Sequence, residues 1–77
     1  TDLAIAEYRR AVKAQPDWGD AHFNLALLLT KVERCEEALA AWQRFLEVEP
    51  SGKHATTAQK AIALCRMKIQ QDKAQAG

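Results

Sequence analysis

Residues 4–16 read AIAEYRRAVKAQP, and residues 38–50 read ALAAWQRFLEVEP. The two stretches lie 34 residues apart and share an Ala, an aromatic residue four positions later and a Pro twelve positions after the Ala. Ala21 and Ala55 follow the two prolines at the same 34-residue spacing. A repeat of this period is the sequence signature of an array of equivalent structural units.

Apolar residues recur at spacings of three and four residues through four segments, and this spacing predicts amphipathic helices. The expected helices cover residues 1–16, 18–32, 36–49 and the segment that follows Ser51. Pro16 and Pro50 end the first and third helices, because the residue before a proline is pushed out of the α-helical region. Asp17 and Ser51 are predicted N-caps of the second and fourth helices. Short loops make neighbouring helices antiparallel, so we expect an all-α array of helix-turn-helix units.

One face of each helix is predicted to be buried. The predicted stripes contain Ala4, Tyr8, Ala11, Val12 and Gln15 in the first helix, Ala21, Leu25, Leu28, Leu29 and Val32 in the second, and Ala55, Ala58, Ile62, Cys65 and Ile69 in the fourth. Tyr8, Trp42 and Phe45 are expected to supply most of the bulk of this small core.

The composition is typical of one small, soluble, globular domain: 77 residues, 48% apolar and 27% charged. The longest apolar run, Leu25 to Leu29, has five residues, far fewer than the roughly 20 that cross a membrane. Two cysteines, Cys35 and Cys65, fit no known motif and favour a reducing, cytoplasmic setting. Thr1 opens helical sequence without an initiator Met, so we expect a piece of a longer protein.

The net charge of +1 combines a net −3 in residues 1–50 with a net +4 in residues 51–77. Lys53, Lys60 and Lys68 are expected on the face opposite the apolar stripe of the fourth segment, with Arg66 and Lys73 at its margins, as in a solvated outer surface. This helix has no aromatic residue to stack on a base, so the sequence disfavours nucleic acid as a partner. Attraction to an acidic protein surface is the alternative.

The residues that carry enzyme chemistry are not found in recognisable patterns. Three glycines form neither a dinucleotide-binding nor a phosphate-binding loop. Ser51 and His54 suit a capped first helical turn better than a nucleophile and its base. The histidines and cysteines lack the close pairs of metal sites, and we interpret His22 as a packing residue, Cys35 as a turn residue and Cys65 as a core residue. We therefore expect no catalysis, cofactor, metal or small-molecule substrate.

The order of residues resembles the tetratricopeptide repeat family, whose pattern is W-x2-L-G-x2-Y, then A-x3-F, then P. This chain has His22-x2-Leu25-Ala26-x2-Leu29, then Ala38-x3-Trp42 and Pro50, preceded by the half-repeat Ala4-x3-Tyr8 and Pro16. The resemblance implies that residues 1–16 are the second helix of a truncated repeat, 17–50 a complete repeat and 51–77 a capping helix. The usual Gly between paired helices is replaced by Glu33 or Arg34, which would be strained if the turn needs a positive φ.

In this family the first helix of each pair lines a concave groove that holds a peptide or helix of a partner protein. The resemblance implies a groove on residues 18–32 that contains Asp20, Phe23, Asn24, Leu27, Thr30 and Lys31. Phe23 and Leu27 would provide apolar contact, and Asn24 would bind the partner's backbone. Burial of this apolar pair under neighbouring helices is the simpler alternative.

Leu64 and Met67 are expected on the outer face of the fourth helix, where a capping helix should be polar. They suggest a second function, in which copies of the chain associate or the chain docks onto another domain of its parent protein. Isolated exposed apolar residues are also common without any function.

Overall fold

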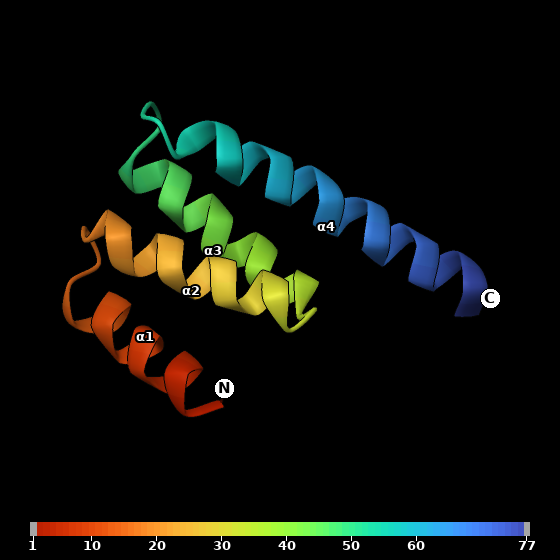
Figure 1. Cartoon of the computed structure of the whole chain (residues 1–77), viewed down its shortest axis with the longest axis horizontal. Coiled ribbons are helices and arrows are strands. Elements are labelled where there is room, and N and C mark those ends of the chain that lie inside the picture. The colour runs from red at the N-terminus through yellow and green to blue at the C-terminus, as the bar shows by residue number, and fades with distance from the viewer. Residues whose placement is uncertain (1, 77) are drawn as a thin grey trace.

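The computed structural model describes residues 2–76, with side-chain environments up to residue 74. It contains four α-helices, α1 (Asp2–Ala14), α2 (Gly19–Lys31), α3 (Cys35–Val48) and α4 (Ala55–Ala76), and no strand within these residues. Successive helices run in opposite directions (Figure 1). The predicted all-α array is therefore confirmed for the described part of the chain; Thr1 and Gly77, the outer ends of the first and last predicted segments, lie outside it.

The helices lie side by side in chain order, and each one packs mainly against its neighbours in sequence (Figure 1). Within the described residues the backbone of α1 packs against α2, and side chains of α1 reach α3 and the turn before it through exposed ion pairs. The helices α2 and α4 touch only slightly. The last helix, α4, runs well past the ends of the others (Figure 1). No helix among the described residues has the length and apolar character to cross a membrane.

The core lies along the α2–α3 interface and extends under α4. Its largest fully buried side chains are Trp42, Phe45, Leu29 and Cys65. The predicted stripes are buried or partly buried as expected, with two exceptions, Gln15 and Val32, which are exposed. Both lie just beyond the end of a helix, where the 3.6-residue period no longer sets the direction of a side chain.

The turn from α2 to α3 adopts the Schellman geometry of a helix C-terminus. The amide of Arg34 donates to the carbonyl of Leu29 at 2.9 Å, and that of Glu33 donates to Thr30 at 3.1 Å. Glu33 has a φ of 62°, a left-handed conformation that normally favours glycine. The expected strain at this turn is thus located at Glu33.

Both predicted N-caps are wrong. The residue before α2 is Trp18, which makes no side-chain cap, and Asp17 lies one position too early. The carboxylate of Glu49 instead covers the N-terminus of α2: a Cβ atom at Gly19 would lie 2.6 Å from Glu49 Oε2. A negative charge at this place is favourable to the helix dipole. Ser51 is exposed and lies four residues before the first residue of α4, too far to cap it. The first turn of α4 is closed by the amide of Ala58, which donates to the backbone carbonyl of His54.

Candidate functional site

The six residues predicted to line a groove on α2 are in very different environments. Asp20, Asn24 and Lys31 are exposed, whereas Phe23, Leu27 and Thr30 are partly buried. Phe23 and Leu27 pack against the core. The apolar pair is therefore covered in part by neighbouring elements, as the simpler alternative anticipated.

The ring of Phe23 belongs to an aromatic cluster between α2, α3 and the loop before α4. Its centroid lies 5.5 Å from Trp42, 5.5 Å from Phe45 and 4.4 Å from His54. Such distances are typical of favourable aromatic contacts. Phe23 thus contributes to the packing of three segments.

Thr30 uses its hydroxyl group inside the protein. It donates a hydrogen bond to the carbonyl of Ala26 at 2.8 Å and accepts one from Trp42 Nε1 at 3.0 Å. The indole N–H of this buried tryptophan is therefore satisfied, and Thr30 serves the core rather than a groove rim.

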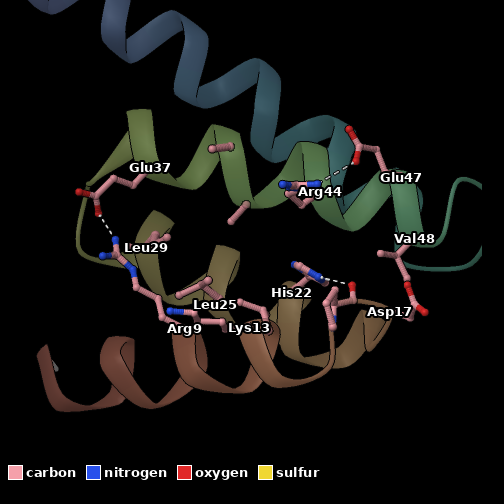
Figure 2. A pocket seen from close by; sticks show the side chains of 14 residues that line it. Arg9, Lys13, Asp17, His22, Leu25, Leu29, Glu37, Arg44, Glu47 and Val48 are labelled. Atoms are coloured by element: carbon pink, nitrogen blue, oxygen red, sulfur yellow. Dashed lines mark hydrogen bonds and ion pairs between the residues drawn. The ribbon is translucent and has the colours of Figure 1, made fainter.

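A groove of about 940 Å³ opens on another side of α2, between α1 and α3. Figure 2 shows His22, Leu25 and Leu29 of α2 between the two flanking helices. Apolar residues of both flanking helices complete the walls, namely Val12, Ala40, Ala41 and Val48. None of the six predicted residues lines this groove.

His22 is held in place at one end of the groove floor. Its Nε2–H donates a hydrogen bond to the carbonyl of Pro16 at 2.8 Å. The side chain is buried, which confirms its interpretation as a packing residue, and the bond ties α2 to the loop that leaves α1.

Charged side chains form the rim of the groove. Arg9 of α1 reaches across to Glu37 of α3, with 2.9 Å between Nη2 and Oε2 (Figure 2). Arg44 pairs only with Glu47 of its own helix, at 3.5 Å, and both side chains are about 70% exposed, so the pair contributes little stability. Lys13 forms no ion pair within the described residues. Arg44 and Lys13 are therefore cations that an incoming carboxylate can engage.

No group of three or more His, Cys, Asp or Glu side chains is arranged to hold a metal ion in the described part of the chain. Leu64 and Met67 lie on α4 with 61% and 54% of their surfaces exposed.

Comparison with protein-family models, curated proteins and solved structures found no match.

The sequence contained one signal for the α1–α3 groove that the helix-by-helix interpretation missed. Ala40 and Val48 widen the apolar face of α3 beyond the stripe that the core needs. Small or apolar residues beside a complete core stripe indicate a second contact surface on the same helix.

Proposed function

We propose that this chain is a non-catalytic protein-interaction module of the tetratricopeptide type, acting in the cytoplasm, which holds a segment of another protein in its α1–α3 groove. The observation that supports this proposal most strongly is the groove itself: an apolar floor between two helices whose backbones do not pack together and whose rims are bridged by the Arg9–Glu37 ion pair. Concave apolar sites with a few polar groups are the usual form of a binding site.

The rim indicates the chemistry of the partner segment. Lys13 and Arg44 stand on opposite helices of the groove and lack a partner across it, whereas Arg9 is already paired with Glu37. A segment with apolar side chains and at least one carboxylate would satisfy both the floor and these cations.

Panning a displayed peptide library against the chain tests this proposal. Ala40→Glu places a carboxylate in the groove at an exposed position of α3, so it should abolish binding of the selected peptides without unfolding the protein. Ala63→Glu is the matched control, because Ala63 is an exposed helical alanine on α4 and does not line the groove.

Asn24→Lys separates this site from the groove predicted from sequence, since Asn24 is exposed on another face of α2. Peptides that lose binding to Asn24→Lys but retain it with Ala40→Glu would place the site on the predicted face and contradict the α1–α3 site. Failure to enrich any apolar and acidic peptide would contradict the interaction proposal.

The exposure of Leu64 and Met67 favours a second function, the association of copies through α4. Sedimentation over a range of concentrations should then show a dimer that Leu64→Glu removes and Gln71→Glu, at another exposed position of α4, does not. A monomer at all concentrations would contradict this role.

A further inference from the structure

The two cysteines of the chain are both buried in one core cluster although they lie thirty residues apart in sequence. Cys35 is the first residue of α3, and Cys65 lies in α4. Both are free thiols, 9% and 1% exposed, in the same core cluster. Cys35 is thus a buried helical residue, which corrects its interpretation as a turn residue, whereas that of Cys65 as a core residue is confirmed.

An independent contact shows the register of α4 at this point. Lys68 Nζ lies 2.6 Å from Glu33 Oε1. Because Glu33 precedes Cys35 by two residues and Lys68 follows Cys65 by one helical turn, the ion pair shows that the Cys65 turn of α4 lies beside the start of α3.

The surroundings of Cys65 keep it protonated in the reduced protein. Burial, together with the neighbouring Cys35 thiol, raises the pKa of the Cys65 thiol to about 11. Cys35 and Ile69, which follows Cys65 by one helical turn, line the same cavity, so the two thiols are neighbours across the α3–α4 interface. A disulfide needs the two Cα atoms to lie within about 7 Å of each other, a separation that facing turns of two packed helices reach with a small movement.

The two thiols differ in their access to solvent. A surface cavity of about 370 Å³ is lined by Cys35, together with Arg34 of the preceding turn and Ile69 and Lys73 of α4. Cys65 is not part of this lining. A small oxidant therefore reaches Cys35 first.

We propose that Cys35 and Cys65 form a reversible dithiol–disulfide site that responds to hydrogen peroxide. The sulfur of Cys35 attacks the peroxide, the O–O bond breaks, and a sulfenic acid and one water form. The sulfur of Cys65 then attacks that of Cys35, and the S–S bond forms as the sulfenic oxygen leaves in a second water. Two electrons pass from the sulfur pair to the peroxide. The bond would fasten α4, which barely touches α2, to the start of α3.

The experiment treats the full chain with hydrogen peroxide, blocks remaining thiols with N-ethylmaleimide and measures the intact mass. We expect a monomer that has lost two hydrogens and binds no maleimide, and that dithiothreitol restores. Trypsin should release residues 35–44 joined to residues 61–66, because cleavage falls after Arg34, Arg44, Lys60 and Arg66. By the entropy of closing a loop of this length, the oxidised form should melt about 15 °C or more above the reduced form.

Cys35→Ala and Cys65→Ala are the matched variants, since Ala keeps a small apolar side chain at each buried position. In each variant, peroxide treatment should give no linked peptide and no increase in melting temperature. Should either variant fail to fold, the linked peptide of the wild-type protein still decides the question. Disulfide-linked dimers, oxidation of Cys35 to sulfinic acid without a linked peptide, or two thiols that stay reduced would overturn the proposal.

Discussion

The hydrogen bond between Trp42 and Thr30 offers a quantitative test of how the core is assembled. Trp42 is completely buried, and its indole N–H donates to Thr30 Oγ1 at 3.0 Å. Thr30→Val keeps the shape of the side chain but removes the acceptor, so that the indole N–H has no partner in the interior. Trp42→Phe removes the donor and about three ring atoms.

The expected losses in free energy of unfolding follow from these changes. Thr30→Val should cost about 1–3 kcal/mol, the usual penalty for an unsatisfied buried donor. Trp42→Phe should cost roughly 2 kcal/mol from the lost apolar contact alone. The double variant should lose about 1 kcal/mol less than the sum of the single variants, because the bond is lost only once. Trp42→Ala, at about 3–5 kcal/mol, would leave too little stability for such a measurement.

Urea unfolding followed by circular dichroism at 222 nm gives the four free energies of this cycle. Thr57→Val is the control for the threonine change, because Thr57 is exposed on α4, and it should be additive with Trp42→Phe. Additivity of Thr30→Val and Trp42→Phe to within about 0.4 kcal/mol would refute the hydrogen bond and the orientation of the indole that it requires.

Three further predictions concern the turns and the buried thiol. Glu33→Gly should stabilise the protein by about 0.5–1 kcal/mol, measured by thermal unfolding, because it relieves the positive φ and loses only an exposed ion pair with Lys68; a lower melting temperature would contradict the strain. Asp17→Ala and Ser51→Ala should each change stability by less than about 0.5 kcal/mol, whereas loss of a true N-cap costs about 1 kcal/mol. The pKa of Cys65 is raised to about 11 in the folded protein. The protonated thiol therefore adds to the free energy of unfolding below the pKa of the unfolded thiol, near 9, and this addition is lost as pH rises through 11. In urea unfolding, the free energy of unfolding of the wild-type protein should fall on the order of 2 kcal/mol more than that of Cys65→Ala between pH 8.5 and 11. Equal falls in the two proteins would contradict the raised pKa.

The sequence predicts the number and order of the helices well because prolines and apolar periodicity act locally. Pro16 and Pro50 end their helices through contacts with the preceding residue, which any sequence shows directly. The caps were not predictable in the same way. Whether Asp17 caps α2 depends on the path of the loop, and Glu49, thirty residues further along the chain, adds its charge to that of Asp20 at this N-terminus.

The candidate site was less accessible to sequence reasoning. A helical wheel shows that Phe23 lies beside the core stripe, but the cover over its ring comes from His54, in the loop before α4. The position of Cys65 relative to Cys35 was equally hidden, because tertiary packing sets the register of α4 against α3. Residues far apart in sequence decide both environments.

In an array in which each helix packs on the next one, helices that are two apart in chain order do not pack together. A space is therefore left between them on each face of the array. Here these spaces lie between α1 and α3 and between α2 and α4. Their fate depends on side-chain size. The ring of Phe23 and its contact with His54 occupy part of the space between α2 and α4, whereas the walls between α1 and α3 contain residues such as Ala40 and Ala41 and leave a groove. The room for a partner therefore depends on small side chains on helices that are two apart in chain order. Polar residues on the face of a single helix are a weaker guide to it.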